Sequence, residues 1–408
     1  MIRKLYGDGI HDDTAMLQDM IDNAGCELTL PQPEVCYLIS APLELPSNFK
    51  LTLPRYAEVK LAAGSDCFML QNKVRRLISD ASLINYSNLS DMYKLYGYLE
   101  WYAPDDPAEN IEVCGGVWNC NNLEQSANPL YTQVYENGYS GFGMLFYNVK
   151  GLTLRQMTLK DPVNFAVTLD KVSYFTVEDI SFDFNYGNPY AINMDGIHLN
   201  GNCHFGLIRN LKGTCYDDTV ALNADEGSCG PITNIEISGI WAENNHSAVR
   251  LLSCEESVEN VHVHDIYGTY YQYCVGLTKY YSGDTAGRFS NIVIDNIYAS
   301  KAERLNIYQK DNTYVYPIIY LENEIKITDV TISDIHRIET ETPVETIYLG
   351  KDVEINMMSI RNIHTENKTG KPMPAFVNNG KIKKLHMTNV ETNGDPVLVN
   401  NGEIEENI

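Results

Sequence analysis

Nine short segments between residues 152 and 390 repeat one pattern, in which alternating apolar residues are followed by a small or polar residue and one more apolar residue. The closing apolar residues of consecutive segments lie 23 to 38 residues apart. The segments read LTLRQM, FTVEDI, GLIRNL, IEISGI, VHVHDI, IVIDNI, VTISDI, MSIRNI and LHMTNV, and they close at Met157, Ile180, Leu211, Ile240, Ile266, Ile297, Ile335, Ile363 and Val390. Strand-length segments that return at such intervals indicate a repeat architecture.

A second set of short segments alternates with the first along the chain. Its members read AVTLD, GIHLN, TVALN, AVRLL, CVGLT, IIYLE, TIYLG, AFVNN and VLVNN. Each repeat therefore contributes at least two strands, and the segments lack the 3.6-residue periodicity that a helical repeat needs. The sequence predicts an all-β fold, a single-stranded right-handed parallel β-helix of about ten rungs, where a rung is one turn of the coil.

The N-terminal stretch predicts a cap on this coil. Asp12 or Asp13 is a suitable N-cap for one amphipathic helix, which extends to about Ala24 and ends at Gly25. A single helix before a β-solenoid covers the open edge of its first rung. We expect the apolar face of the helix to consist of Ala15, Met16, Met20 and Ile21.

We predict one domain over residues 1–408, with the cap in 1–30, irregular loops in 80–141 and regular rungs in 142–402. The loop region departs from the repeat, as the walls of a binding groove commonly do. The alternative is that these loops cover and pack against sheet surface. The tyrosines of the region include Tyr131, Tyr135 and Tyr139.

The charge of the chain excludes some partners. Lys and Arg number 30 against 54 Asp and Glu, a formal net charge of −24. So much negative charge argues against binding to nucleic acid or to an anionic membrane surface.

The chain has no apolar stretch near the roughly 20 residues that cross a bilayer. Residues 1–8 lack the apolar core of a signal peptide. We expect a cytoplasmic protein if Met1 is the native start, and a secreted or periplasmic one if a signal peptide was removed.

Three consecutive members of the second set are preceded by acidic or imidazole side chains. On a parallel β-helix, equivalent positions of neighbouring rungs stack about 4.8 Å apart. When the strands are aligned on their first inward apolar residue, Asp195 and Asp218 share one position. Asp217 and His246 share the position one residue earlier. We therefore expect three carboxylates and an imidazole to meet on one patch.

Such a patch suits acid and base catalysis. Clustered like charges raise each other's pKa, so one carboxyl acts as an acid while another stays ionised as a base. Inverting hydrolysis of a glycosidic bond uses this division, with the two carboxyl groups roughly 6.5–9.5 Å apart. Neighbouring rungs and their diagonals are compatible with that spacing. The alternative is that these Asp residues only cap turns where strands begin.

The same residues resemble the motifs of glycoside hydrolase family 28, the polygalacturonase and rhamnogalacturonase group of pectin-active β-helices. The family's N-T-D, D-D and G-H-G motifs correspond here to Asn193-Met194-Asp195, Asp217-Asp218 and Asn245-His246-Ser247. The opening YGDGIHDDTAMLQDMID and the segment IEVCGGVWNCNN are also similar to stretches of that group. The resemblance spans most of the chain, which would be a divergent member.

The resemblance implies that Asp217 is the general acid. Asp195 and Asp218 would then position and deprotonate the attacking water, and His246 would tune the acid or bind sugar. The expected partner is an oligo- or polysaccharide, and we expect no cofactor and no metal; a monomer and a homo-oligomer both stay open. The family motif and the outward positions of the second set suggest these substrate-binding residues: Asn193, His198, Arg250, Lys279, Tyr280, Tyr320 and Tyr348.

The chain departs from the family at the R-I-K motif. The strand alignment places Gly276 and Thr278 at the Arg and Lys positions. Lys279, one residue displaced, or Arg250 of the preceding rung would have to supply the missing cation. In the family those cations hold a uronate carboxylate by charge-assisted contacts. Their loss favours a neutral or mixed glycan, such as a pectin-related side chain, over polygalacturonate.

His262 and His264 of VHVHDI lie on one face of a predicted strand, as two metal ligands would. Because the sequence places no carboxylate or third ligand in register with them, we interpret them as stacked surface residues. The ten cysteines are scattered without a CxxC pair. That pattern favours buried free thiols over a metal or disulfide framework.

Three functions compete on this sequence. The leading one is an inverting glycoside hydrolase that acts on a plant or microbial polysaccharide or oligosaccharide. The second is a polysaccharide lyase or epimerase, a class that typically needs Ca²⁺ and a Lys or Arg base beside a uronate. The third is a non-catalytic or phage-type carbohydrate-binding β-helix. The sequence leaves the sugar, and endo or exo action, open.

Overall fold

The computed structural model describes residues 4–73, 75–78, 99–102, 107–127, 141–188, 190–281, 283, 285–302 and 315–408. Apart from one α-helix and one 3₁₀ turn, the regular secondary structure of these residues consists of β-strands, and the strands pair in parallel from rung to rung as in a right-handed parallel β-helix. The predicted fold class is therefore confirmed. The chain divides into two compact units. The first runs to Leu207 and includes Glu226–Ser228, and the second comprises Ile208–Asp225 and Cys229–Ile408. The prediction of one domain over 1–408 stays a prediction.

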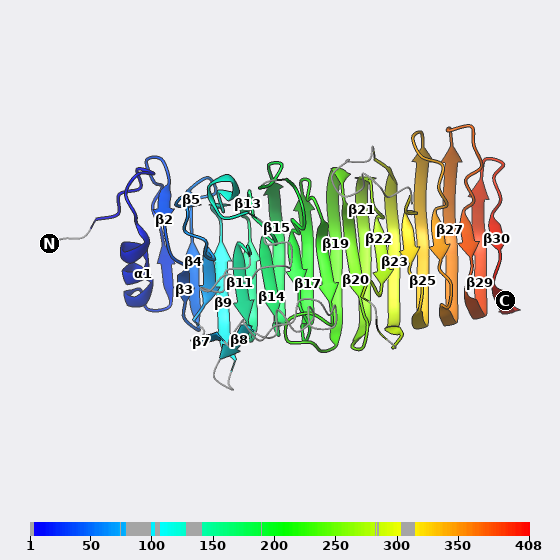
Figure 1. Ribbon diagram of the computed structural model, residues 1–408, viewed down its shortest axis with the longest axis horizontal. Helices are drawn as coiled ribbons and strands as arrows, with labels where there is room; N and C mark the ends of the chain where they lie inside the picture. Colours follow the sequence, from blue (N-terminus) through cyan, green and yellow to red (C-terminus); the bar gives the residue numbers. More distant parts are fainter. Residues whose placement is uncertain are drawn as a thin grey trace. The chain divides into compact units, whose positions relative to one another are not determined.

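The first unit begins with the helix α1 (Thr14–Asn23), which Figure 1 shows beside the first strands. Its strands are β1 (Glu27–Thr29), β2 (Tyr37–Ile39), β3 (Leu43–Leu45), β4 (Phe49–Thr52), β5 (Glu58–Leu61), β6 (Leu70–Asn72), β7 (Arg75–Ile78), β8 (Leu99–Tyr102), β9 (Ala108–Cys114), β10 (Val117–Asn119), β11 (Met144–Tyr147), β12 (Val149–Arg155), β13 (Thr158–Lys160), β14 (Val167–Asp170), β15 (Ser173–Asp183) and β16 (Ile197–Leu199). A 3₁₀ turn, η2, spans Asn122–Glu124. The strand β17 (His204–Lys212) contains the boundary between the units.

Three parallel ladders build the first unit. One joins β1, β4, β9, β12 and β15. Another joins β2, β5, β10, β13 and β15, and the third joins β3, β6, β11, β14 and β16. Since every ladder takes one strand from each rung, the three ladders form the faces of a coil with an apolar interior.

Part of the region predicted as irregular loops belongs to this coil. β9 and β10 lie within residues 80–141, yet β9 pairs with β4 and β12, and β10 pairs with β5 and β13. Their alternating apolar residues, such as Ile111 and Val113, are buried and continue the pattern of the later rungs. Residues 80–98, 103–106 and 128–140, with the three predicted groove tyrosines, lie outside the described residues.

The second unit consists of long and short strands in alternation, and Figure 1 shows the long ones running side by side. β19, β21, β23, β25, β27, β29 and β31 pair in one parallel ladder, and β18, β20, β22, β24, β26, β28 and β30 pair in another. Their bounds are β18 (Asp218–Asn223), β19 (Ile232–Asn245), β20 (Ser247–Leu252), β21 (Ser257–Tyr270), β22 (Val275–Thr278), β23 (Gly287–Lys301), β24 (Ile319–Leu321), β25 (Ile325–Glu339), β26 (Ile347–Leu349), β27 (Glu354–Asn367), β28 (Phe376–Asn378), β29 (Lys381–Thr392), β30 (Leu398–Asn400) and β31 (Glu403–Asn407).

The repeated sequence pattern has a local structural cause. The residue before the closing apolar residue has a positive φ in all nine segments, at Gln156, Asp179, Asn210, Gly239, Asp265, Asn296, Asp334, Asn362 and Asn389. Gly, Asn and Asp adopt this left-handed conformation more readily than other residues. It bends the strand and turns the next apolar side chain inward. The closing residues are accordingly buried, with the exception of the half-buried Val390 near the C-terminus.

The capping helix forms where the sequence predicts it, but its buried face differs. α1 buries Leu17 and Ile21, whereas Ala15 is exposed and Met16 and Met20 are half-buried. Leu17 and Ile21 lie four residues apart and therefore point to the same side of the helix. The Asp13 side chain does not cap the helix but accepts backbone hydrogen bonds from residues 6 and 7. None of the helices in the described ranges is long and apolar enough to cross a membrane.

Candidate functional site

Asp195 belongs to a buried group of charged side chains in the first unit. His198 Nδ1 lies 2.7 Å from Asp195 Oδ2, and His198 Nε2 lies 3.0 Å from Glu226 Oε2. The three side chains are between 1% and 5% exposed. Burial disfavours the imidazolium, but the hydrogen bonds to Asp195 and Glu226 outweigh it and raise the pKa of His198 to about 9. At neutral pH a buried imidazolium therefore bridges two carboxylates.

Aromatic and polar neighbours hold this group in place. The Phe165 ring stacks on His198 with the ring centroids 3.8 Å apart. Asn200 Oδ1 lies 3.2 Å from His198 Nε2, and its amide nitrogen donates to Asp170. Burial raises the pKa of Asp170 to about 6. The register pairs His198 with Thr168 of the preceding strand, which is also buried.

Two predicted substrate-binding residues are therefore placed differently from what we expected. His198 should face outward, but it is 1% exposed and serves as the partner of Asp195 and Glu226. Asn193 is 4% exposed and has a φ of 58°, which makes it a turn residue. Sequence reasoning missed Glu226, because it lies in a turn after the strand and outside the repeated pattern.

The second unit brings Asp217, Asp218 and His246 together. His246 Nδ1 lies 3.2 Å from Asp217 Oδ1 and 3.9 Å from Asp218 Oδ1. The register pairs Asp218 with Ser247, so the aligned positions predicted for Asp217 and His246 do meet. Ser247 Oγ donates a hydrogen bond to Asp218 Oδ1 and lies 3.0 Å from His246 Nδ1. One ligand atom from each of the three residues lies within 4.8 Å of the others, so they are close enough to share one cation.

Arg250 places a positive charge beside this cluster. Its Nη1 atom lies 3.7 Å from Asp218 Oδ2, and its Nε donates to Thr278 Oγ1. The guanidinium carbon lies 4.7 Å from the centroid of the Tyr280 ring, a cation–π contact. Tyr280 is 65% exposed, so one face of this arrangement is open to solvent. That Arg250 and Tyr280 contact sugar stays a prediction.

His246 is neutral at physiological pH. Burial lowers the pKa of His246 to about 3, and the charges of Arg250 and Lys301 act in the same direction. The Tyr271 ring packs edge-on against the imidazole, with the centroids 5.2 Å apart. Lys301 Nζ donates to the backbone carbonyls of Tyr271 and Gln272 and so holds the turn that carries this ring.

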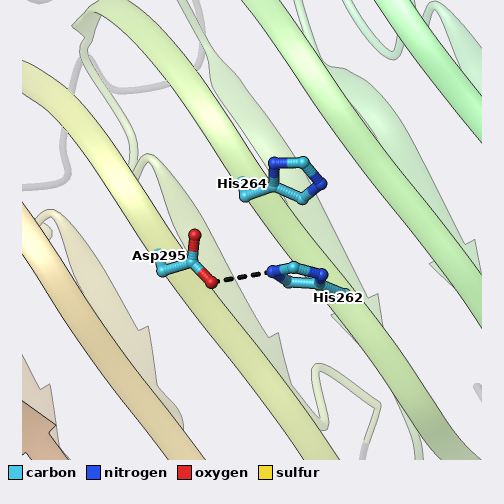
Figure 2. A group of neighbouring side chains, drawn as sticks. All are labelled: His262, His264 and Asp295. Carbon is cyan, nitrogen blue, oxygen red and sulfur yellow. Dashed lines mark hydrogen bonds and ion pairs between the residues drawn. The ribbon is translucent and has the colours of Figure 1, made fainter.

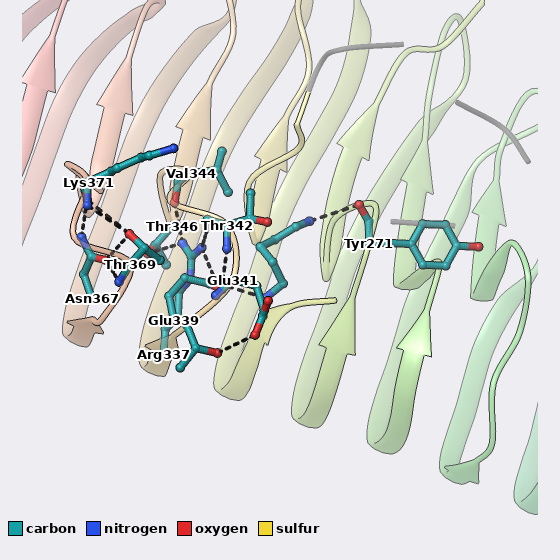
Figure 3. A network of polar contacts seen from close by, with 12 residues as sticks. Tyr271, Arg337, Glu339, Glu341, Thr342, Val344, Thr346, Asn367, Thr369 and Lys371 are labelled. Atoms are coloured by element: carbon teal, nitrogen blue, oxygen red, sulfur yellow. Dashed lines mark hydrogen bonds and ion pairs between the residues drawn. The ribbon is translucent and has the colours of Figure 1, made fainter. Parts of the chain in front are cut away.

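A buried ion pair is connected to that turn through Lys301, as part of the polar network drawn in Figure 3. Arg337 and Glu339 are fully buried, and Arg337 Nη2 lies 2.7 Å from Glu339 Oε2. The guanidinium also donates to Val344 O and Thr346 Oγ1. Glu339 Oε2 accepts the backbone N–H of Lys301. The network therefore links the core of the later rungs to the residue that positions Tyr271.

The row that contains Arg250 agrees with the predicted alignment. Arg250 pairs with Gly276, which pairs with Tyr320, which in turn pairs with Tyr348. Tyr320 is 8% exposed, and its ring stacks on the half-buried Tyr348 at a centroid distance of 5.9 Å. Tyr273 was missed. Its ring would lie 2.6 Å from a Cβ atom on Gly276, so it fills the space where the family's Arg would stand.

Lys279 does not replace the missing cation. Its Nζ atom lies 2.7 Å from Glu324 Oε2 and donates to Gly283 O, and the residue is 5% exposed. Because the buried ammonium already has these partners, breaking its contacts to bind a ligand would bring little net binding energy. We correct the prediction accordingly: Arg250 is the cation at the cluster, and Lys279 is part of the fold.

Comparisons with known proteins support the fold. A family 28 exopolygalacturonase from Yersinia enterocolitica matches with a TM-score of 0.57 and 14% identity, over 98% of this chain and 75% of that chain. An endo-xylogalacturonan hydrolase from Aspergillus tubingensis matches with a TM-score of 0.58 and 14% identity, over 98% of both chains. A mutant tailspike protein of E. coli bacteriophage HK620, in complex with pentasaccharide, matches with a TM-score of 0.57 and 13% identity, over 97% of this chain and 75% of that chain.

At these identities the likeness shows a shared β-helix fold and not membership of family 28. No protein-family model matches the sequence. No curated protein matches it either.

Proposed function

We propose that this chain is a glycoside hydrolase that cleaves an oligo- or polysaccharide. The observation that carries the proposal is the cluster in the second unit, where a partly exposed and a buried carboxyl approach the same neutral imidazole. The fold supports it, because an exopolygalacturonase and an endo-xylogalacturonan hydrolase share the β-helix. The tailspike with its bound pentasaccharide adds a carbohydrate ligand on the same fold.

Asp217 is the proposed general acid. Its side chain is 15% exposed, against 1% for Asp218, so a glycosidic oxygen can reach Asp217. A neutral His246 can accept a hydrogen bond from a protonated carboxyl. An imidazolium, by contrast, would favour the ionised carboxylate through its positive charge. In the proposed step, the Asp217 proton passes to the leaving-group oxygen as the bond between that oxygen and the anomeric carbon breaks.

Asp218 provides negative charge beside the acid. The Ser247 hydroxyl and the Arg250 guanidinium both face its carboxylate and stabilise that charge. One oxygen of Asp217 lies within 4.8 Å of one oxygen of Asp218. That is closer than the roughly 6.5–9.5 Å between the carboxyl groups of an inverting pair. Inversion therefore needs a further carboxylate to deprotonate the water, and Asp195 in this role stays a prediction from the sequence.

A neutral or mixed glycan is the proposed substrate. Arg250 already contacts Asp218, Thr278 and Tyr280, and Lys279 is paired with Glu324. Because both cations already have partners within the protein, they would bind a uronate carboxylate more weakly than the Arg and Lys of the family motif would. The exposed Tyr280 ring instead provides an apolar face and a hydroxyl, which suit the faces and hydroxyl groups of a sugar.

The proposal is tested by digestion of a glycan panel that contains neutral, mixed and uronate-rich polymers. We expect the wild type to release sugar from a neutral or mixed member, and Asp217→Asn to lose activity by about 10²- to 10⁴-fold. Asp352→Asn is a matched control, because Asp352 is exposed and has a left-handed φ that Asn also adopts. Full activity in a folded Asp217→Asn protein would refute the assignment. NMR of the first product shows the anomeric configuration, and retention would refute inversion.

A carbohydrate-binding protein without catalysis is the second candidate. The observation that favours it is the burial of Asp218 at 1% exposure, since Ser247 and Arg250 would also neutralise a purely structural carboxylate. In that case a panel member binds in calorimetry, the wild type releases no sugar, and Asp217→Asn binds as well as the wild type.

A further inference from the structure

His262 and His264 lie outside the proposed catalytic cluster, on the ladder of long strands in the second unit. Both belong to β21, two residues apart, so their side chains lie on the same face of the sheet. The register pairs His264 with Asp295 of β23. Figure 2 shows both imidazoles beside the Asp295 carboxylate. The sequence interpretation was that no carboxylate lies in register with these histidines, and Asp295 overturns it.

The three side chains present a compact set of ligand atoms. One ligand atom from each lies within 4.8 Å of the others. His262 Nε2 lies 2.7 Å from Asp295 Oδ2, and the two imidazole centroids are 4.2 Å apart. The side chains of His262, His264 and Asp295 are 43%, 20% and 27% exposed, so an ion can reach them from solvent.

A second layer of contacts orients His264. Its Nδ1 atom lies 2.8 Å from Asp265 Oδ2, and Asp265 in turn accepts a hydrogen bond from the Asn296 amide. Histidines that bind a metal commonly engage a carboxylate through their other ring nitrogen, which fixes the tautomer and the ring orientation. His264 Nε2 is left facing Glu236 Oε1 at 3.5 Å, and Glu236 lies on the neighbouring strand β19.

We propose that His262, His264 and Asp295 bind one divalent transition-metal ion, with Glu236 or water completing the coordination. Imidazole and carboxylate together suit Zn²⁺, Ni²⁺, Co²⁺ and Cu²⁺, whereas Ca²⁺ and Mg²⁺ prefer sites made of oxygen alone. Two ligands on a tetrahedral ion lie about 3.4 Å apart when each bond is about 2.0–2.1 Å long. His262 and Asp295 therefore need to separate by about 0.7 Å. For Nε2 of His262 to bind the ion, the ring proton of the neutral imidazole has to reside on Nδ1, so the hydrogen bond to Asp295 is replaced by the two metal bonds.

The bound ion joins neighbouring rungs. It links β21 to β23, and to β19 when Glu236 is a ligand. An ion that binds the folded protein and not the unfolded chain stabilises the folded protein by linkage. This inference is independent of the proposed hydrolase activity, because it shares no residue with the Asp217 cluster.

Calorimetry and thermal unfolding of the full chain, first dialysed against EDTA, test the proposal. We expect Zn²⁺ and Ni²⁺ to bind at one site per chain and to raise Tm, and Ca²⁺ and Mg²⁺ to have no such effect. His264→Gln and Asp295→Asn should each weaken Zn²⁺ binding at least tenfold. His364→Gln is the matched control, because His364 is an exposed histidine on the same ladder that also lies 3.5 Å from a carboxylate, Glu391. It should bind Zn²⁺ as the wild type does.

Asp217→Asn/Asp218→Asn separates this site from the other possible one, since those residues and His246 also form a compact ligand set. Loss of Zn²⁺ binding in that variant and full binding in His264→Gln would overturn the proposal. Absence of saturable Zn²⁺ and Ni²⁺ binding to the wild type would overturn it too. Circular dichroism and the Tm of each variant without metal show whether it is folded. If His264→Gln is misfolded, the proposal is tested by Zn²⁺ binding to Asp295→Asn and by the visible absorption of Co²⁺ bound to the wild type.

Discussion

Asp217 and His246 face each other on neighbouring rungs, with Asp217 Oδ1 3.2 Å from His246 Nδ1. Burial keeps His246 neutral by lowering its pKa to about 3. An acid that rests against a neutral nitrogen holds its proton more readily than one that rests against an imidazolium. Under the proposed function, the neutral imidazole is the partner to which a protonated Asp217 would donate its hydrogen bond.

His246→Gln tests this pair. Glutamine keeps a polar side chain near Asp217 but removes the ring nitrogen, so we expect kcat to fall by less than the roughly 10²- to 10⁴-fold loss of Asp217→Asn. The alkaline limb of the pH–rate profile should also move, because that limb reports the protonation of the general acid. Steady-state kinetics from pH 4 to pH 9 measure both effects. An unchanged profile with unchanged kcat would show that His246 does not act on the acid.

The buried group around His198 makes stability depend on pH. The folded-state pKa of about 9 lies above the ordinary value of about 6.5. The stabilisation from protonated His198 is therefore complete below about pH 6.5 and is lost as the pH rises through about 9, a change of about 3 kcal/mol. Urea unfolding of the wild type and His198→Gln at pH 6 and pH 9.5 measures it.

We expect the stability difference between wild type and His198→Gln to be large at pH 6 and small at pH 9.5. The subtraction removes the contribution of other groups that titrate in this range. The same difference at both pH values would mean that His198 does not carry a bridging proton in the folded protein.

The left-handed bends predict different costs for two substitutions at one position. Asn362 has a φ of 53°, donates to Asp334 and accepts from the Asn389 amide. Asn362→Ala should lower the free energy of unfolding by about 1–3 kcal/mol, since Ala disfavours this conformation and lacks the amide. Asn362→Gly should cost less, because glycine adopts a positive φ without strain. Chemical denaturation compares the two, and equal losses would contradict the bend argument.

The buried Arg337–Glu339 ion pair predicts that the stability of the folded protein depends strongly on both residues. Arg337→Met leaves the Glu339 carboxylate buried without its cation, and we expect it to cost about 3–5 kcal/mol. Adding Glu339→Gln should recover part of that loss. Arg361→Met is the control, because Arg361 is exposed. Thermal unfolding of the four proteins measures the effects, and a small effect of Arg337→Met would show that the pair contributes little.

Much of the fold follows from neighbouring residues. The alternation of apolar side chains sets the strands, and the small or polar residue before each closing position sets the bend, as Asp265 and Asn296 show. The same alignment brings Asp217 to His246 and Arg250 to Gly276. Because the rungs stack in register, residues at equivalent positions of the sequence repeat lie next to each other in the structure. The prediction of the buried face of α1 was wrong for most of its residues, because the helix has several apolar residues and the sequence does not show which of them face the coil. The structure buries Leu17 and Ile21.

The sequence by itself determined the parallel β-helix and the rows of aligned residues, because both depend on a periodicity that is local. Tertiary structure alone decided which members of a row are accessible: His198 is buried under Phe165, Lys279 is paired with Glu324, and Arg250 stays at the cluster. It also brought Glu226 to His198 and Asp295 to His262. Such contacts depend on turns and neighbouring strands whose side chains follow no repeat, so their charges and burial appear only once the coil is closed.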